Sequence, residues 1–347
     1  MIEISKLKNW SPPDGQTEFQ TIDAHTEGEP LRIILSGYPD LKGKTLLEKR
    51  TDAQNHHDEL RKALIWEPRG HADMYGAIIV EPDTTGADFG VIFIHNEGYS
   101  TGCGHAVIAL TKVFVETGLI SMNEPETEVK MDVPSGFIKS YAKVKNGQVT
   151  GVRFENVPSF VQLLDTEVDV PGLGMINYDL AFGGAFYAFV DVAQFDLDCN
   201  PKYYNQLIET GMKIKHAIMD SVEMVHPLET DMNFLYGTIF TSALKDPNHH
   251  SRNVCIFAEG EVDRSPTGTG VSARAAILHA KGELKVGESI IIESIIRSTF
   301  SVKVVATTTF GNYDAVIPEV SGNAYITGKN IFWINQEDPL KDGFILR

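Results

Sequence analysis

Two stretches of the chain, far apart in the sequence, repeat one pattern: an apolar strand, a polar loop, and an apolar helix that begins at glycines. In the first stretch, the strand at residues 89–95 leads into residues 102–105 and a long apolar run. In the second, residues 253–258 lead into residues 267–270 and a similar apolar run. Positions 103 and 267 correspond, and their offset of 164 residues is nearly half of the 347-residue chain. We therefore expect two similar lobes that present two helix N-termini to one cleft.

Cys103 lies between two glycines at the start of the first predicted helix. Free backbone N–H groups and the positive end of the helix dipole gather at such a position and favour a thiolate. Gly104 lets a ligand approach the backbone closely. Two helix ends that face one cleft would bind a carboxylate without any arginine. A buried structural cysteine on a tight turn is the simpler alternative.

The distribution of strands and helices predicts an α+β fold of two pseudo-symmetric lobes. Each predicted helix is apolar nearly all the way round, which is typical of a core element. Short strands make up most of the rest, so we expect a curved, mostly antiparallel sheet wrapped around each central helix. The chain is long enough for two sizeable cores. The first lobe is predicted to contain residues 1–156, and the second begins at residue 157.

Other local patterns predict particular elements. Residues 45–65 are predicted to form one helix, because Thr45 and Glu48 fit a capping box. Asn146-Gly147 predicts a hairpin turn between two strands. Residues 203–224 are predicted to form a surface helix of the second lobe.

Composition excludes some classes of function. The formal net charge of −17 argues against nucleic acid and anionic membranes as partners. Three cysteines do not build a disulfide framework. Residues 1–10 lack the apolar core of a signal peptide, and no apolar run is long enough to span a bilayer. We therefore expect a cytoplasmic protein whose thiols stay reduced.

Three motifs carry a family resemblance that covers most of the chain. Residues 263–270 read D-R-S-P-T-G-T-G, which resembles the D-R-S-P-C-G-T-G motif of the proline racemase family. Residues 103–105 resemble the C-G-H motif of that family, and residues 25–30 resemble its H-T-x-G-E-P stretch. Racemases and 4-hydroxyproline epimerases of the family have cysteine in both motifs, whereas this chain has Thr267 in the second. A Cys/Thr pair of this kind resembles the trans-3-hydroxy-L-proline dehydratase branch.

The resemblance implies several further features. The fold is expected to be diaminopimelate-epimerase-like, with the active site in the cleft between the lobes. The C-terminal strand is expected to return to the first lobe, which then contains residues 1–156 and about 324–347, while the second contains residues 157–323. A homodimer is implied. No cofactor is predicted, because no glycine-rich phosphate loop indicates a nucleotide and nothing in the sequence requires pyridoxal phosphate. The aspartate that matches Asp263 pairs with the substrate ammonium in the family, whereas a capping role in its loop is the structural alternative.

The residue types at the two helix starts indicate proton abstraction next to a carboxylate. Such a site must neutralise the carboxylate and place a strong base at the Cα–H. Cys103 is the candidate base, whereas an aliphatic hydroxyl such as that of Thr267 is too weakly acidic to act as one. Backbone N–H groups for the substrate carboxylate are expected from four residues: Gly104, His105, Gly268 and Thr269. The His105 side chain is expected to contact either the substrate or Asp263.

One base on one face suits dehydration better than racemisation. In trans-3-hydroxy-L-proline the α-hydrogen and the 3-hydroxyl group share a ring face. A thiolate at Cys103 could remove the proton and return it to the leaving hydroxide, while Thr267 orients the ring or a water. The expected products are water and an enamine that tautomerises to Δ1-pyrroline-2-carboxylate. The substrate is therefore predicted to be a cyclic imino acid.

Three alternatives remain open at this point. A racemase or epimerase would need an unrecognised second base; Cys255 lies in an apolar strand segment and Cys199 in a proline-flanked loop, so neither is expected to fit. A non-catalytic amino-acid-binding protein would need the helix ends and the aspartate but no reactive thiol. A metal hydrolase would have to use histidines of the pairs His56-His57 or His249-His250, which lack a recognised ligand spacing. No metal site is predicted.

Overall fold

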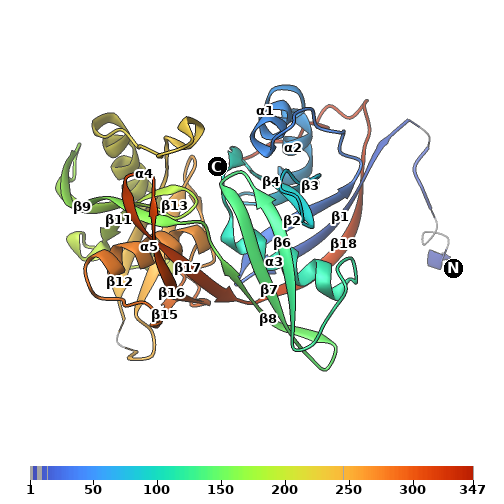
Figure 1. The fold of residues 1–347 in the computed structure, drawn as a ribbon. Coiled ribbons are helices and arrows are strands. Elements are labelled where there is room, and N and C mark those ends of the chain that lie inside the picture. The colour runs from blue at the N-terminus through green and yellow to red at the C-terminus, as the bar shows by residue number, and fades with distance from the viewer. Residues whose placement is uncertain (1–2, 6–9, 14, 245, 347) are drawn as a thin grey trace.

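The computed structural model describes residues 3–5, 10–13, 15–244 and 246–346. Most of the N-terminal decapeptide, on which the predicted location partly rested, lies outside these residues. Figure 1 shows two groups of strands side by side, each packed around a helix, with α3 in one group and α5 in the other.

The first strand group packs against α3 (Gly104–Glu116). Its members are β1 (Thr17–Thr26), β2 (Glu29–Ser36), β3 (Tyr75–Val80), β4 (Phe89–His95), β5 (Gly98–Ser100), β6 (Glu126–Val133), β7 (Gly136–Lys145), β8 (Gln148–Glu155) and β18 (Ala324–Ile334). The pairing runs β18–β1–β2–β3–β4–β6–β7–β8, and only β2–β3 and β4–β6 are parallel in this series. Each parallel pair needs a crossover, and helices supply it: α1 and α2 for the first pair and α3 for the second.

The second strand group packs against α5 (Gly268–Ala280). Its members are β9 (Ser159–Val170), β10 (Gly174–Phe182), β11 (Phe186–Asp191), β12 (Leu235–Ala243), β13 (Ser251–Phe257), β14 (Glu261–Val262), β15 (Ser289–Glu293), β16 (Thr299–Phe310) and β17 (Tyr313–Gly322). The pairing runs β9–β10–β11–β12–β13–β15–β16–β17 and returns to β9, so these strands form a closed barrel. Here β11–β12 and β13–β15 are the parallel pairs, in the same relative places as those of the first group.

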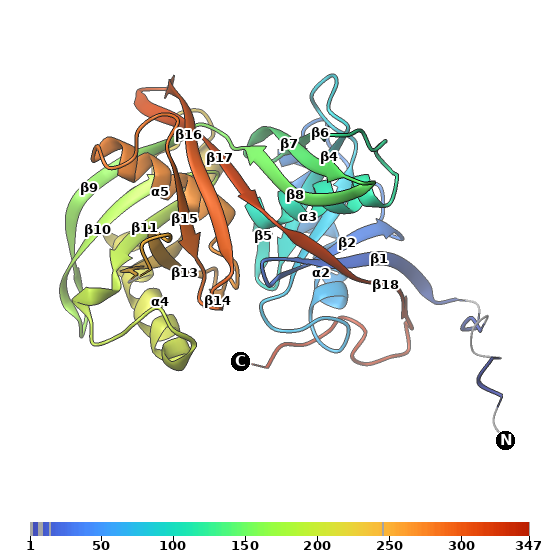
Figure 2. The ribbon, with the colours of Figure 1, turned by 90° about the horizontal axis from the view of Figure 1, so that it is seen from below.

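The two strand groups are joined near the end of the chain. β17 pairs with β8 of the first group, and one residue later β18 begins and pairs with β1. Figure 2 shows this continuous path from β17 into β18. The polypeptide therefore crosses between the groups without a flexible linker.

Both central helices are buried because their side chains are apolar on nearly every face. In α3 only Lys112 and Glu116 are not buried, and the helix packs against β1, β2, β7, β8 and β18. In α5 the residues that are not buried are Arg274, His279 and Ala280, and the helix packs against β9, β10, β11, β16 and β17. Such packing fixes the position of each helix start relative to its sheet.

The remaining helices lie away from the centre, and one prediction about them is wrong. The segment predicted as a single helix forms α1 (Leu46–His56) and α2 (Asp58–Ile65), because His57 leaves the helical region with φ −139°. The capping box of Thr45 and Glu48 is confirmed. α4 (Tyr204–Ser221) is slightly shorter than predicted. Within the described residues, no helix has both the length and the apolar character needed to cross a bilayer.

The hairpin predicted at Asn146-Gly147 is confirmed between β7 and β8. Both residues have positive φ, 54° and 70°, as a two-residue type I′ turn requires. Glycine accepts this conformation without strain, and asparagine tolerates it better than most residues.

Candidate active site

The N-termini of α3 and α5 meet at two glycines. A Cβ atom added to Gly104 would lie 2.5 Å from Gly268 Cα, and one added to Gly268 would lie 2.6 Å from Gly104 Cα. Only glycine allows this approach, so the two positions are matched. The residues before them, Cys103 and Thr267, are the N-caps of the two helices.

Both N-caps line one cavity of about 20 Å³. The cavity is bounded by residues from both strand groups: Glu29, Tyr75, Gly102, Cys103, Gly104, His105, Tyr187, Tyr236, Cys255, Phe257, Asp263, Thr267, Gly268 and Thr269. All seven residues predicted for the site are among them. The structure therefore brings together residues that are 164 positions apart in the sequence.

Cys103 is buried, with its Sγ 3.3 Å from His105 Nδ1. Burial raises the pKa of the Cys103 thiol well above its ordinary value, and the Ala106 backbone N–H at the helix start lowers it by less. The nearby carboxyl groups of Asp263 and Glu29 raise this pKa further. The helix end acts in the predicted direction, but burial outweighs it, so the free site holds a thiol.

His105 is a neutral imidazole in this environment. Burial lowers the pKa of its ring to about 3, and a hydrogen bond to the Pro30 backbone raises it only in part. Thr26 Oγ1 donates to the His105 carbonyl oxygen at 2.7 Å, which ties the first turn of α3 to β1. The ring also packs edge-on against Tyr75. His105 can therefore exchange hydrogen bonds with Cys103 but carries no charge there.

Thr267 has an unusual backbone. Its φ of 68° lies in the left-handed region, which is strained for a β-branched residue. Its N–H donates to Ser265 Oγ at 3.1 Å, and its carbonyl oxygen accepts from Val271 N–H at 2.7 Å. Thr267 Oγ1 is buried without a hydrogen-bond partner of ordinary geometry among the described residues. It is nevertheless near enough to Asp263 and Cys255 to lower the pKa of each side chain.

Asp263 is buried beside the second helix start. Its Oδ1 accepts from Ser265 N–H at 2.7 Å, so the capping role considered from the sequence is present. Burial raises the pKa of its carboxyl group, and hydrogen bonds from Ser265 partly offset this. Asp263, Glu29 and His105 each have one atom that could ligate a metal ion, and these three atoms lie within 4.8 Å of one another. Groups of this kind can hold a metal ion in proteins, so the cluster is suited to a cation.

Four ring-bearing residues of the cavity wall were not predicted from the sequence. Tyr75 Oη lies 2.8 Å from Tyr236 Oη, which links β3 of the first group to β12 of the second. Tyr187 Oη lies 2.7 Å from Thr269 Oγ1, and Phe257 stacks on Tyr236. These residues stand in apolar strands, where an aromatic side chain is usual, and no local signal distinguishes them.

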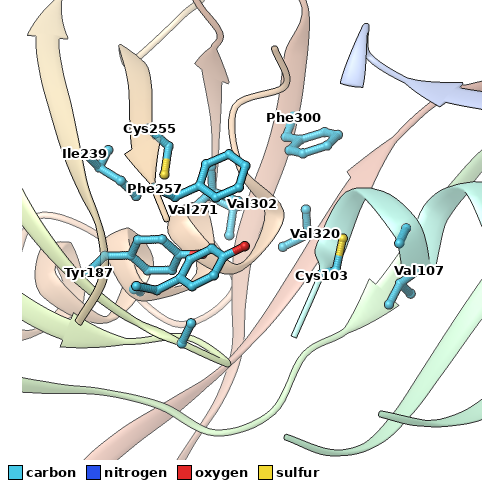
Figure 3. Packing of buried hydrophobic residues seen from close by; sticks show 14 of the residues in the cluster. Cys103, Val107, Tyr187, Ile239, Cys255, Phe257, Val271, Phe300, Val302 and Val320 are labelled. Carbon is cyan, nitrogen blue, oxygen red and sulfur yellow. The ribbon is translucent and has the colours of Figure 1, made fainter. Parts of the chain in front are cut away.

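Glu29 and Cys255 were also missed, although the sequence drew attention to both. Glu29 belongs to the H-T-x-G-E-P stretch, and a carboxyl group at the start of an apolar strand was the available signal. Cys255 was set aside because of its apolar strand, yet it lies in the cavity wall. Figure 3 shows the two thiols on different elements, Cys103 at the start of α3 and Cys255 on β13. Burial raises the pKa of the Cys255 thiol well above its ordinary value.

The two histidine pairs do not contribute to the cavity. His56 and His57 both contact Asp52, at 3.0 and 3.9 Å, so they do not diverge as adjacent helical residues would. His249 Nδ1 lies 2.6 Å from Glu293 Oε1 in a loop beside β13. Neither pair belongs to a group of three ligands in the described part of the chain.

The profile of the proline racemase family matches residues 21–345. The chain belongs to the proline racemase family. It is 51% identical over 345 residues to a trans-3-hydroxy-L-proline dehydratase of Colwellia psychrerythraea, with 99% of this chain and 97% of the relative covered. It is 45% identical over 329 residues to a 3-hydroxyproline 2-epimerase of Burkholderia multivorans, with 95% and 98% covered.

Solved structures of the proline racemase family have the same fold. A hydroxyproline epimerase from Agrobacterium vitis with bound trans-4-hydroxy-L-proline superposes with a TM-score of 0.89. It is 34% identical, and the match covers 95% of this chain and 96% of the other. The α+β fold with a closed barrel is therefore that of the family.

Proposed function

We propose that this protein dehydrates trans-3-hydroxy-L-proline to Δ1-pyrroline-2-carboxylate and water. The observation that carries the proposal is the pair of helix N-caps at one cavity, Cys103 on α3 and Thr267 on α5. One cap is a thiol and the other a hydroxyl, so of the two caps only Cys103 has a group that can lose its proton and act as a base. Relatives at 44–51% identity, which match nearly the full chain, bear the name of this dehydratase.

The substrate carboxylate would bind between the two helix starts. Backbone N–H groups of Gly104, His105, Gly268 and Thr269 are the donors without helical partners there, and the helix dipoles favour an anion. Asp263 would accept from the ring ammonium. A cavity of about 20 Å³ has room for a water but not for a five-membered ring, so the site must open to admit the substrate.

The reaction begins from the small fraction of Cys103 that has lost its proton to solvent, and this thiolate removes the α-proton from C2. The electron pair of the C2–H bond forms the C2–C3 double bond, and the C3–O bond breaks. The leaving hydroxide takes a proton from the Cys103 thiol, which regenerates the thiolate and gives water. The resulting enamine gains a proton at C3 and loses one from nitrogen to give the cyclic imine. Thr267 would orient the ring or a water on the other side, since its hydroxyl group cannot act as a base.

We also propose a division into two pseudo-symmetric lobes, residues 1–156 with about 324–347 and residues 157–323, with the active site in the cleft between them. The matching positions of the parallel strand pairs in both strand groups support this division. A cytoplasmic homodimer remains part of the proposal. Light scattering coupled to size-exclusion chromatography would test the dimer.

The function is tested by separate incubation with three compounds: trans-3-hydroxy-L-proline, trans-4-hydroxy-L-proline and L-proline. We expect imine formation from the first, detected with an aldehyde reagent, and little inversion of the other two, detected by chiral chromatography. Fast inversion without imine formation would contradict the proposal.

A second candidate function is epimerisation, and the position of Cys255 supports it. This thiol lies in the cavity wall near Thr267, where a second acid–base group would be needed. If the wild-type protein inverts trans-4-hydroxy-L-proline and the Cys255→Ala variant does not, then Cys255 is the second base. If dehydration persists unchanged in Cys255→Ala, the thiol takes no part in the main reaction.

A further inference from the structure

Glu29 is a buried carboxyl group that the proposed mechanism does not yet use. It is the first residue of β2, it is fully buried, and it lines the cavity. Its Oε2 accepts from Arg264 N–H at 2.7 Å, whereas Oε1 has no hydrogen-bond partner among the described residues. An unpartnered carboxylate oxygen in a buried site is costly, so a group that can donate to it is expected there.

Two other polar side chains lie close to the Glu29 carboxyl group, and neither is a cation. A carboxylate oxygen of Asp263 and a ring nitrogen of His105 each lie within 4.8 Å of a Glu29 carboxylate oxygen. The guanidinium group of Arg264 is directed elsewhere, to Asp73 at 2.9 Å and to the Val262 carbonyl oxygen at 2.9 Å. The site therefore gathers two carboxyl groups and a neutral imidazole around a place where a small cation would fit.

The ring ammonium of a cyclic imino acid matches this arrangement. A secondary ammonium carries two N–H bonds that point in different directions, so one carboxylate satisfies only one of them. Resting on the proposed function, we propose that Glu29 Oε1 accepts the second N–H of the ring ammonium, while Asp263 accepts the first. Glu29 then acts as a residue that binds the substrate and selects for a charged ring nitrogen.

Two ligands separate this role from a structural one. L-proline carries a ring ammonium with two N–H bonds, whereas pyrrole-2-carboxylate has a neutral ring nitrogen with one. Both have the carboxylate that the helix ends would bind. Isothermal titration calorimetry of wild-type protein and Glu29→Gln with each ligand measures how much Glu29 contributes to recognising the charge.

We expect Glu29→Gln to weaken L-proline binding about 10- to 100-fold, as the loss of a charge-assisted hydrogen bond predicts. Binding of pyrrole-2-carboxylate should change by less than about threefold, which would also show that the variant is folded. Equal weakening of both ligands, unchanged L-proline binding, or a wild-type protein that binds neither would each overturn the proposal.

Glu293→Gln is the matched control. Glu293 is also buried and ends a strand, but it pairs with Arg252 and His249 and does not line the cavity. Both ligands should bind this variant as they bind the wild-type protein. Because neither ligand has a 3-hydroxyl group, the result does not depend on turnover. Intact discrimination without dehydration would contradict the proposed function alone, and equal weakening would contradict the role of Glu29 alone.

A measurement on the wild-type protein tests the proposal even if the Glu29→Gln variant does not fold. Two neighbouring carboxyl groups without a cation retain a proton, and a bound ammonium would displace it. The charged and titratable groups around Glu29 are Asp263, Arg264, Asp73, His105, Cys103 and Cys255. Titrations in buffers of different ionisation enthalpy should therefore show proton release with L-proline and none with pyrrole-2-carboxylate. Equal proton release with both ligands would overturn the proposal.

Discussion

The starts of α3 and α5 occupy equivalent places in the fold but differ in backbone and side chain. Cys103 is extended, with φ −150° and ψ 94°, whereas Thr267 has φ 68° and ψ 98°. The Cys103 thiol has His105 beside it, while the Thr267 hydroxyl group has no partner of ordinary geometry among the described residues. A repeated architecture has therefore produced two chemically unequal helix ends, of which only one can titrate.

The strain at Thr267 indicates that its surroundings hold it in place. A β-branched residue in the left-handed region costs on the order of 1–3 kcal/mol. Ser265 accepts its N–H, and a Cβ added to Gly270 would lie 3.0 Å from Thr267 Cγ2, so the local packing leaves little freedom. The backbone of Thr267 is thus held in this conformation at the cavity wall.

The largest expected effect comes from removing the end that titrates. Cys103→Ser should lower kcat about 10²- to 10⁴-fold, because a serine hydroxyl is a far weaker base than a thiolate. Cys199→Ser is the matched control, since Cys199 is buried but does not line the cavity, and it should keep wild-type kcat. Steady-state imine formation measures both variants. A folded Cys103→Ser protein with most of the wild-type kcat would contradict the role of Cys103.

The second prediction concerns pH. Burial raises the pKa of Cys103, and its active form is the deprotonated one, so the thiolate fraction is small at neutral pH and increases as pH rises. We expect kcat/KM to rise about tenfold per pH unit until this pKa is reached. Alkylation of Cys103 by iodoacetamide should follow the same dependence. A kcat/KM that is already flat near pH 6 would mean that the helix end outweighs burial after all.

The third prediction concerns Asp263, which lies beside the start of α5, the helix end whose N-cap Thr267 cannot titrate. Asp263→Asn keeps an oxygen for the Ser265 N–H but loses the charge, so kcat/KM should fall about 10- to 100-fold, as expected for a charge-assisted hydrogen bond. The melting temperature should change little, because the cap is retained. If kcat/KM of the folded variant is unchanged, Asp263 has only its capping role.

The smallest expected effect is the gain of a weak new activity. Thr267→Cys makes the two helix ends alike and should introduce weak inversion of trans-4-hydroxy-L-proline, measured by chiral chromatography. Cysteine is not β-branched, so it suits φ 68° at least as well as threonine. Thr267→Ser, which restores no titratable group, is the control and should show no inversion. Equal inversion by wild type and Thr267→Cys would show that the difference between the ends is not decisive.

Local patterns were sufficient to locate both helix ends. Helices that begin at Gly104 and Gly268 were predicted because glycine and apolar periodicity are properties of neighbouring residues, and both are confirmed. The break at His57 was missed because no proline or glycine marks it. The part of the fold that depends on short-range sequence was thus largely predictable.

The walls of the cavity were not predictable in the same way. Tyr75 and Tyr236 meet across 161 positions, and nothing near either residue in the sequence records the contact. The expectation that the helix end favours a thiolate at Cys103 was wrong for a related reason. Burial raises the pKa of this thiol, and burial is a property of the folded molecule that cannot be judged from the two flanking glycines. Glu29 was quoted as part of a motif, but its free oxygen becomes visible only beside Asp263.

The contact between Gly104 and Gly268 has a consequence for how this chain can diverge. A methyl group at either position would force the two helices apart, and no side-chain change at the other position could relieve this clash, because the clashing atoms belong to the backbone. The side chains of the residues immediately before them, Cys103 and Thr267, are not among the nearest atoms at this contact. New activities on this scaffold are therefore expected to arise by exchanging single side chains at positions 103 and 267, on a backbone whose geometry is inherited unchanged.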